Sequence, residues 1–318
     1  MKILVTGANG VIGRELFTLL PSLYEVVALD IKKNVDFPNK YKFIECDLTD
    51  IALLKSQIGI IPSTVIHCAG LAHQKVGAYD RDAYIKINSE ATENLASIAA
   101  EKNKLHFIFL STISVYGESD LLQPVSEDSL SNPSSDYAFS KLDAEKRLIA
   151  LYEKGIIHKL TILRLAPVYD RDFRLNLERR IFGPKKIAYV VFGNGQQSMS
   201  ALARPNLIDF IEHILKRRGS ERSIEVINVC DPKPYSFYEI IKTFKNNNIY
   251  GYKPVVPVPL SMVWFLTRLA GSIFRKQKLW FHSCYDKVAG SLVFDNTRML
   301  QTGFQPRHDL HSVFAKRN

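Results

Sequence analysis

The stretch Lys2-Ile3-Leu4-Val5-Thr6-Gly7-Ala8-Asn9-Gly10-Val11-Ile12-Gly13 decides the fold of this chain. It joins a short apolar run to three glycines with the spacing GxxGxxG, and a helical pattern follows. A strand that enters a helix through such a loop lets a pyrophosphate approach the backbone at the positive helix N-terminus. The stretch therefore predicts a dinucleotide site. Its candidate residues are Gly7, Asn9, Gly10, Val11, Ile12 and Gly13.

An acidic residue stands at the end of the next predicted strand, in Val26-Val27-Ala28-Leu29-Asp30. A carboxylate at this place accepts hydrogen bonds from the adenosine ribose hydroxyls and repels a 2′-phosphate. We therefore expect NAD as the cofactor and NADP as the less favoured one. Lys32 and Lys33 weaken this preference, because they could hold a phosphate.

Short apolar runs alternate with helical patterns through the first half of the chain. This alternation predicts βαβ units and a parallel sheet. The expected strands are 2–6, 25–29, 42–46, 64–67, 106–110 and 160–165, and the expected helices are 11–20, 51–58, 81–102 and 137–154. The fold class is therefore α/β, a Rossmann-type doubly wound parallel sheet.

Beyond residue 166 the pattern loosens, and prolines and glycines interrupt it. We expect a dinucleotide-binding domain over residues 1–166, with a return strand near 225–229. Residues 167–318 are expected to form mainly a smaller, mixed lobe that binds substrate.

Charge and cysteine content exclude several classes of protein. The chain has 318 residues and a net charge of +10, of which residues 161–318 carry +13 and residues 1–160 carry −3. No zinc finger, RNP-like motif or long basic run accompanies this charge, so nucleic acid is not an expected partner. The four cysteines lie far apart without a CxxC pair, so we expect no metal site and a reducing, cytoplasmic location. The N-terminal apolar run is too short for a signal peptide.

The most apolar stretch runs from Val255 to Phe274 and contains Pro257, Pro259 and Arg268. Its longest uncharged part is shorter than the roughly 20 residues that a membrane span needs, so no transmembrane segment is expected. The stretch is interpreted as a buried helix with a proline-rich lead-in. A role at a membrane surface stays open as the alternative.

Two further motifs point to redox chemistry on an alcohol. Tyr137 and Lys141 stand four residues apart and share one side of a predicted helix. A neighbouring ammonium favours the phenolate, which makes Tyr137 a candidate proton shuttle between alcohol and ketone. Thr112 follows an apolar strand, where a hydroxyl reaches the crevice in which parallel-sheet ligands bind, and it could hold the reacting oxygen.

Together these motifs resemble the extended short-chain dehydrogenase/reductases, in particular the NAD-dependent nucleotide-sugar epimerase/dehydratase family. The resemblance implies that Asp47 and Leu48 contact the adenine and that Cys68, Ala69 and Gly70 lie beside the cofactor. It also implies a catalytic tetrad of Asn88, Thr112, Tyr137 and Lys141, in which Lys141 and Tyr137 also hold the cofactor. Thr112, Tyr137 and Asn176 are the substrate contacts that it implies. The segment 164–169 resembles the family's LRxxxVYG, with Asp170 in place of the glycine.

Two departures from the family pattern bear on the reaction. Ile113 and Ser114 replace the Asp-Glu pair with which dehydratases eliminate water, so a 4,6-dehydratase is disfavoured. The loop Gly193-Asn194-Gly195-Gln196-Gln197-Ser198 lacks the arginine that many members use for the substrate diphosphate. Arg204 and Arg298 are the candidates to replace it.

The expected function is therefore a nucleotide-sugar 4-epimerase with tightly bound NAD. Residues 258–271 and 289–295 resemble a bacterial subgroup that epimerises or reduces UDP-N-acetylhexosamine derivatives for surface polysaccharides. A 4-ketoreductase of a UDP-4-keto-6-deoxy-N-acetylhexosamine shares the tetrad and is the alternative. A non-catalytic dinucleotide-binding scaffold or sensor is the alternative from another class. Family members often dimerise through two helices, which correspond here to residues 81–102 and 137–154.

Overall fold

The structure is a computed structural model that describes residues 1–58, 62–72, 78–102, 104–117, 124–217, 219 and 221–315. The chain divides into two compact units. The first comprises residues 1–117, 130–165 and 210–227, and the second comprises residues 118–129, 166–209 and 228–318. Each is described by itself below.

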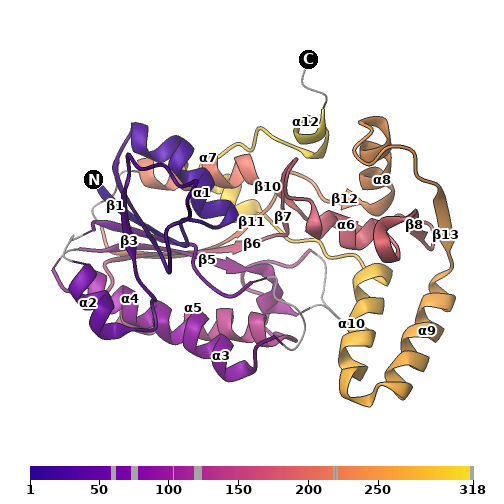
Figure 1. Ribbon diagram of the computed structural model, residues 1–318, viewed down its shortest axis with the longest axis horizontal. Helices are drawn as coiled ribbons and strands as arrows, with labels where there is room; N and C mark the ends of the chain where they lie inside the picture. The colour runs from indigo at the N-terminus through magenta and orange to yellow at the C-terminus, as the bar shows by residue number, and fades with distance from the viewer. Residues whose placement is uncertain are drawn as a thin grey trace. The chain divides into compact units, whose positions relative to one another are not determined.

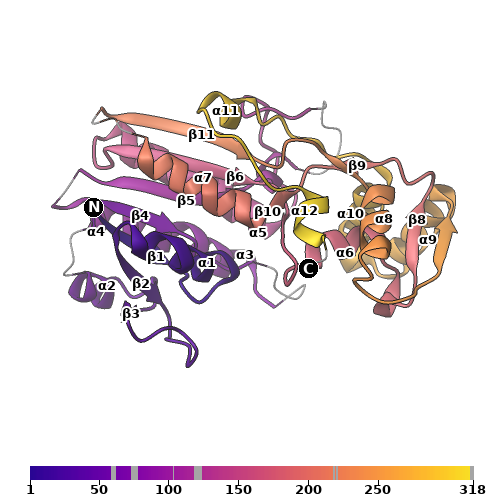
Figure 2. The ribbon, with the colours of Figure 1, turned by 90° about the horizontal axis from the view of Figure 1, so that it is seen from above.

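A seven-stranded sheet, drawn in Figure 1, has the strand order β11-β6-β5-β4-β1-β2-β3, which can be followed in Figure 2. The pairs β1–β2, β1–β4, β2–β3, β4–β5 and β5–β6 are parallel, which confirms the expected doubly wound α/β fold. The chain reverses its direction of travel across the sheet between β1 and β4, and ligands of open parallel sheets bind at such a switch point. The strands are β1 (Lys2–Thr6), β2 (Glu25–Asp30), β3 (Lys42–Glu45), β4 (Thr64–His67), β5 (His106–Thr112), β6 (Lys159–Leu165) and β11 (Ser223–Val229).

Helices cover both faces of this sheet (Figures 1 and 2). Helices α4 and α5 lie on one face, and α1 lies on the other. Side chains mark where several of them begin: Ser135 caps α5, Asp50 caps α2 and Asp80 caps α3, each by accepting a backbone N–H. The helices are α1 (Val11–Leu19), α2 (Ile51–Gln57), α3 (Arg81–Ile85), α4 (Ala91–Ala100), α5 (Asp136–Glu153) and α7 (Arg204–Lys216), and the 3-10 turns are η1 (Leu20–Ser22) and η3 (Ile113–Tyr116).

The expected helix over residues 81–102 forms without a gap over residues 81–100, but its hydrogen-bond pattern changes along the way. A π-helical turn, η2 (Lys86–Glu90), separates α3 from α4 and contains the buried Asn88. Turns of this kind insert an extra residue into a helix and occur frequently at functional sites. The periodicity of apolar residues does not show such an insertion, so the sequence predicted one helix.

The second unit combines short strands and helices. Three two-stranded sheets pair β10 with β7, β12 with β9 and β13 with β8. The strands are β7 (Val168–Tyr169), β8 (Tyr189–Phe192), β9 (Ser198–Met199), β10 (Leu202–Ala203), β12 (Tyr235–Ser236) and β13 (Val255–Val258). The helices are α6 (Leu175–Ile181), α8 (Phe237–Asn246), α9 (Leu260–Ile273), α10 (Lys278–Ala289), α11 (Thr297–Gln301) and α12 (Leu310–Phe314), with the 3-10 turns η4 (Pro184–Lys186) and η5 (Arg275–Gln277).

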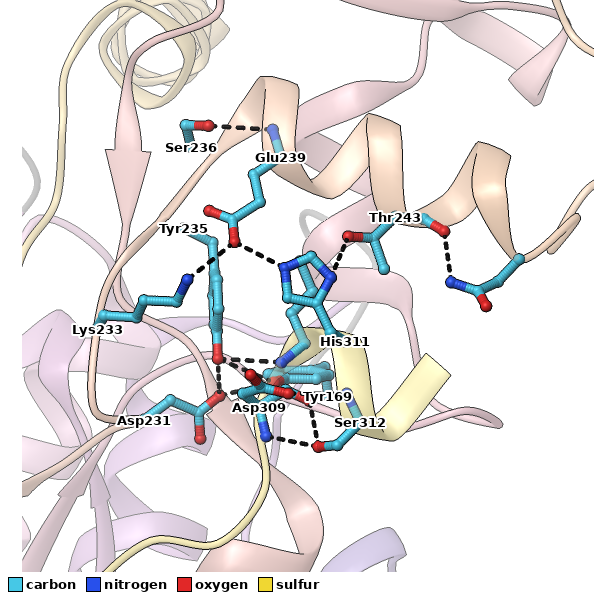
Figure 3. A network of polar contacts seen from close by, with 12 residues as sticks. Tyr169, Asp231, Lys233, Tyr235, Ser236, Glu239, Thr243, Asp309, His311 and Ser312 are labelled. Carbon is cyan, nitrogen blue, oxygen red and sulfur yellow. Dashed lines mark hydrogen bonds and ion pairs between the residues drawn. The ribbon is translucent and has the colours of Figure 1, made fainter. Parts of the chain in front are cut away.

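A buried carboxylate holds several of these short elements together (Figure 3). Asp231 accepts the hydroxyls of Tyr169 and Tyr235 at 2.7 and 2.9 Å. It also accepts the Ala203 N–H at 2.9 Å and the Asn206 amide at 2.8 Å. The Asp231 side chain is 2% exposed. These four hydrogen-bond donors therefore compensate the free-energy cost of removing its carboxylate from water.

The interpretation of residues 255–274 as a buried helix was wrong. Helix α9 forms, but Gly271 is its one buried residue, and large apolar side chains such as Phe265 and Ile273 are 59% and 65% exposed. The apolar composition predicted burial because other elements cover most apolar helices. Nothing in the described part of the chain covers the side of α9 that carries these exposed residues. None of the described helices combines the length and the apolar character needed to cross a bilayer.

Candidate functional site

The glycine loop packs tightly between the ends of β1 and β4. Gly7 has a φ of +66°, and a Cβ at this position would lie 2.7 Å from the backbone nitrogen of Ala69. A Cβ on Gly13 would lie 2.1 Å from the carbonyl oxygen of Gly7, which also accepts the Gly10 N–H at 2.9 Å. Backbone therefore contacts backbone here, and the positions of Gly7 and Gly13 exclude any side chain.

Helix α1 begins directly after this loop. Its N-cap residue is Gly10, and no side chain among the described residues caps its first turn. The first N–H groups of an α-helix lack intrahelical partners and carry the positive end of the helix dipole. Val11 and Ile12 thus offer backbone donors that suit a pyrophosphate.

Asp30 ends β2 beside the same loop. Its Oδ2 accepts the Asn9 N–H at 2.9 Å and its Oδ1 accepts the Ile31 N–H at 2.8 Å. The Asn9 amide donates to the Lys32 carbonyl at 2.6 Å and ties the glycine loop to the segment after β2. A carboxylate has about four lone-pair sites, so Asp30 keeps acceptor capacity for ribose hydroxyls.

The two residues expected near the adenine follow β3. Asp47 Oδ1 accepts both the N–H and the hydroxyl of Thr49 at 2.9 Å. Leu48 packs against the hydrophobic core of the first unit. The backbone turn that Asp47 stabilises therefore places both residues at the carboxyl edge of the sheet.

The motif after β4 joins the cofactor residues to the proposed tetrad. Ala69 donates its N–H to Thr6 Oγ1 at 3.3 Å. A Cβ on Gly70 would lie 2.9 Å from Asn88 Oδ1 and 3.6 Å from Lys141 Nζ. Burial raises the pKa of Cys68 to about 12, so its thiol stays protonated and is not a nucleophile.

Asn88 is 1% exposed and cross-links the loop after β4 to helix α5. Its Oδ1 accepts the Leu71 N–H at 2.6 Å, while its Nδ2 donates to the Leu71 carbonyl at 3.1 Å and to Ser140 Oγ at 3.0 Å. All of its amide groups are thus engaged by protein atoms. This geometry suits a residue that positions others.

Helix α5 places Tyr137 and Lys141 next to Thr112 at the end of β5. The Tyr137 and Thr112 side chains form a hydrogen bond. Lys141 is 5% exposed, and its Nζ donates to the Leu110 carbonyl at 2.8 Å and lies 4.5 Å from the centre of the Phe109 ring. The first unit therefore brings all four expected tetrad residues together with Gly70.

Burial raises the pKa of Tyr137 to about 12, opposed by the hydrogen bond from Thr112. The sequence predicted that the Lys141 ammonium lowers this pKa, but desolvation is the largest contribution to it and the hydrogen bond with Thr112 is the contribution that opposes desolvation. The protein's own groups therefore hold Tyr137 as a neutral phenol at pH 7. A neutral phenol is a proton donor, so its use as a base requires a further positive charge at the site.

The pKa of Lys141 moves in the opposite direction. Desolvation lowers it from 10.5 to about 8, opposed by Cys68 and by Glu145. Below about pH 8 the folded chain therefore holds a buried ammonium at a cost in stability. Between about pH 8 and 10.5 the unfolded chain binds more protons than the folded chain, so this cost is relieved as the pH rises.

We expect Lys141→Met to be more stable than the parent protein at pH 7, with an advantage that shrinks as the pH rises above 8. The change should approach about 1.4 kcal/mol for each pH unit between the two pKa values. Urea unfolding at pH 7 and pH 9.5 measures it. Lys146→Met is the matched control, since Lys146 is exposed on the same helix. An advantage that is constant or grows with pH would contradict the burial of a charged Lys141.

A buried charge network beneath the tetrad was missed by the sequence interpretation. Glu145 is 1% exposed and pairs with Arg164, whose Nη2 lies 2.7 Å from its Oε2. Ser111 also donates to Glu145, and Arg164 Nη1 donates to the Tyr116 hydroxyl at 2.9 Å. The available signal was the spacing of Tyr137, Lys141 and Glu145, which puts three ionisable groups on one helix face.

The three expected substrate contacts outside the tetrad lie in the second unit. The Asn176 amide donates to the Val168 carbonyl at 3.0 Å. Arg204 pairs with Asp170 at 2.8 Å and Asp172 at 2.7 Å and is 11% exposed. Arg298 lies 3.7 Å from Glu127 and 2.5 Å from Asp128 and is 41% exposed. Both arginines already pair with carboxylates, and their binding of a diphosphate stays a prediction.

Asp170 replaces a glycine of the family pattern without requiring a left-handed backbone. Its N–H donates to the Phe173 carbonyl at 2.8 Å, and its Oδ1 accepts the Arg171 N–H at 2.6 Å. Its other carboxylate oxygen pairs with Arg204. The turn that the sequence left open is thus closed by the aspartate side chain.

The glycine loop, the start of α1 and Asp30 together fit a dinucleotide, since they combine a backbone without side chains, backbone donors and a ribose acceptor. Residues 3–230 match the NAD dependent epimerase/dehydratase family. The chain belongs to this family. The expectations of NAD and of an enzyme of the nucleotide-sugar epimerase, dehydratase and reductase group are thereby confirmed at the level of the family.

Individual relatives differ in the reaction that their names give. UDP-glucose 4-epimerase from Vibrio cholerae is 28% identical, with 99% of this chain and 94% of the relative covered. GDP-6-deoxy-D-talose 4-dehydrogenase from Aggregatibacter actinomycetemcomitans is 27% identical, with 76% and 78% covered. The structure of UDP-glucuronic acid 4-epimerase from Bacillus cereus in complex with NAD has a TM-score of 0.72 at 23% identity, covering 99% of this chain and 96% of the other. That likeness shows the shared fold.

Proposed function

We propose that this member of the NAD dependent epimerase/dehydratase family is a nucleotide-sugar 4-epimerase. Its substrate would be a UDP-hexose or UDP-N-acetylhexosamine used in surface polysaccharide synthesis. The observation that supports an oxidation and reduction step is the hydrogen bond between Tyr137 and Thr112 beside the buried Lys141, at the switch-point edge of the sheet. The name of the Vibrio cholerae relative supports the choice of C4 and of UDP.

In this proposal the cofactor is held by the residues that the glycine loop brings together. The N–H groups of Val11 and Ile12 bind the pyrophosphate, and Asp30 binds the adenosine ribose. Lys141 binds the nicotinamide ribose. Bound NAD supplies the hydride acceptor and donor for C4 of the sugar.

The protein's own part in the reaction is to hold and move a proton at the C4 oxygen. Thr112 donates to this oxygen and orients it. Tyr137 accepts the hydroxyl proton during oxidation, for which the positive charge of the oxidised cofactor compensates the raised pKa. In the reverse direction Tyr137 returns the proton as the neutral phenol that its burial favours.

Asp30 should make the protein select NAD over NADP, because a 2′-phosphate would face its carboxylate. We expect Asp30→Ala to lose about tenfold or more in NAD affinity, since hydrogen bonds to a charged group contribute about 1.5–3 kcal/mol. Titration of cofactor-stripped protein with both cofactors measures the preference. Glu25→Ala, at the opposite end of β2, is the control. Equal affinity for the two cofactors in the parent protein would overturn the assignment, with Lys32 and Lys33 as the first residues to test.

The second candidate function is a 4-ketoreductase that acts on a 4-keto-6-deoxy nucleotide sugar. The raised pKa of Tyr137 favours it, because the neutral phenol is the form that protonates a ketone. The Aggregatibacter relative is named for a redox reaction at position 4. The tetrad geometry serves both reactions equally.

One assay separates these reactions. Purified protein is incubated with UDP-, GDP- and dTDP-hexoses and with their 4-keto forms. We expect C4 epimers to interconvert without added cofactor and without net change in NADH absorbance. Stoichiometric consumption of NADH or NADPH with a 4-keto sugar, and no epimerisation, would show the reductase instead. Cofactor binding without turnover of any sugar would favour the non-catalytic scaffold.

We also propose that the chain forms a homodimer through α4 and α5, as expected from the resemblance. These two helices pack against each other and are joined by the ion pair of Arg147 with Glu93 at 2.5 Å, whose side chains are 35% and 33% exposed. Sedimentation velocity of the intact protein measures the assembly, and a monomer at all concentrations would contradict it.

A further inference from the structure

Helices α9 and α10 form an antiparallel hairpin in the second unit (Figure 1). Phe274 and Phe281 face each other across it, with ring centres 6.1 Å apart. A Cβ on Gly271 would lie 3.4 Å from Lys278 Cγ, so the two backbones approach closely there. One side of α9 is therefore occupied by α10.

The opposite side of α9 is apolar and exposed. Helical spacing of i, i+3, i+4, i+7 and i+11 puts five large apolar residues in one stripe. We call these residues the α9 stripe: Met262 (52% exposed), Phe265 (59%), Leu266 (49%), Leu269 (47%) and Ile273 (65%). A helix of a soluble protein normally turns such a stripe toward the core. In α9 the side that is packed against α10 lies opposite the stripe.

The stretch of sequence that contains this stripe carries positive charge alone. Between Glu239 and Asp286 the sequence contains no acidic residue, while it contains seven cations. They are Lys242, Lys245, Lys253, Arg268, Arg275, Lys276 and Lys278. Arg268 stands on α9, where its guanidinium lies 5.7 Å from the centre of the Trp264 ring and contacts the His282 ring of α10 at 3.2 Å. Arg275 and Lys278 follow the C-terminal end of α9.

We propose that the α9 stripe binds the surface of a membrane that contains anionic phospholipids. An in-plane helix of this kind buries its apolar side at the boundary of headgroups and acyl chains, and basic residues beside it attract anionic headgroups. Long cationic side chains keep their charge in the headgroup layer while their stems contact apolar groups. The stripe and its cations match both requirements, and the length of α9 allows binding to one leaflet without crossing the bilayer.

A second copy of this chain fits the surface less well. Two copies that met through the α9 stripe would bring Arg268, Arg275 and Lys278 of both together without an acidic partner in the hairpin except Asp286. Like charges at an interface oppose association. An anionic membrane surface instead complements the charge of the hairpin.

Vesicle flotation with the full-length protein tests this proposal. Vesicles of phosphatidylcholine alone are compared with vesicles of phosphatidylcholine and phosphatidylglycerol. We expect the protein to float with the anionic vesicles. With the neutral vesicles most of it should stay in the bottom fraction of the gradient.

Two pairs of variants separate the apolar and the charged contribution. Phe265→Ser/Leu269→Ser should lower vesicle partitioning about tenfold or more, because each side chain contributes through its buried apolar area. Val35→Ser/Leu130→Ser is the matched control, since both residues are highly exposed apolar residues of the first unit. Arg275→Gln/Lys278→Gln should lower partitioning into anionic vesicles about fivefold per charge. Lys40→Gln/Lys146→Gln is its control.

Absence of flotation with both kinds of vesicle would overturn the proposal. An equal loss in the control variants would overturn it too, because binding would then not depend on the α9 stripe. Sedimentation velocity identifies the competing occupant. If Phe265→Ser/Leu269→Ser turns a dimer into a monomer and the parent protein does not bind vesicles, the stripe is an interface between copies of this chain.

Discussion

Tyr137→Phe is expected to lower kcat by about 10²–10⁴-fold, the usual contribution of a general acid or base. The substitution removes the hydroxyl that Thr112 holds and leaves the ring in place. Binding of NAD and of the nucleotide sugar should change little, since these contacts come mainly from other residues. Steady-state kinetics on the sugar that is turned over, with cofactor titration alongside, measures both quantities.

Tyr84→Phe is the matched control for this variant. Tyr84 lies on α3, close enough to contribute to the raised pKa of Tyr137, but it is not a residue of the proposed tetrad. We expect it to keep kcat within a few-fold of the parent protein. A Tyr137→Phe enzyme with nearly unchanged kcat would show that another group transfers the proton.

Glu145→Ala is expected to cost about 3–5 kcal/mol of unfolding free energy. It leaves the Arg164 guanidinium without its carboxylate partner in a place where the arginine side chain is 9% exposed. Breaking a buried pair by removing one partner is costly because the remaining charge stays desolvated. Chemical denaturation of the two proteins at neutral pH measures the loss.

Two comparisons test the cause of this loss. Glu93→Ala breaks the Arg147–Glu93 pair, whose side chains are about one-third exposed, and should cost less than about 1 kcal/mol. The double variant Glu145→Leu/Arg164→Met removes both charges and should recover much of the stability. A Glu145→Ala protein no less stable than Glu93→Ala would disprove the importance of the buried pair.

The sheet and the glycine loop were predictable because their signals are local. Apolar runs in alternation with helical patterns specify strands and helices within a few residues of the observed bounds. The spacing of Gly7, Gly10 and Gly13 reflects contacts within one strand, turn and helix, so it can be recognised without the rest of the chain. Thr112, Tyr137 and Lys141 could be proposed for a related reason, since each stands at a strand end or on a helix face that local pattern already implies. Asn88 was proposed from the family resemblance alone.

Other features depend on which elements come together in space. The pairing of Glu145 with Arg164 joins residues from α5 and β6, and the raised pKa of Tyr137 follows from burial that spacing alone cannot reveal. The π-helical turn contains Asn88, whose amide contacts Leu71 and Ser140 at once, and these two residues are remote from it in sequence. Helix α9 is a second example of a feature that the local sequence could not predict. Its apolar sequence specified a helix, but whether that helix is covered depends on its neighbours, because burial is a property of the assembled fold.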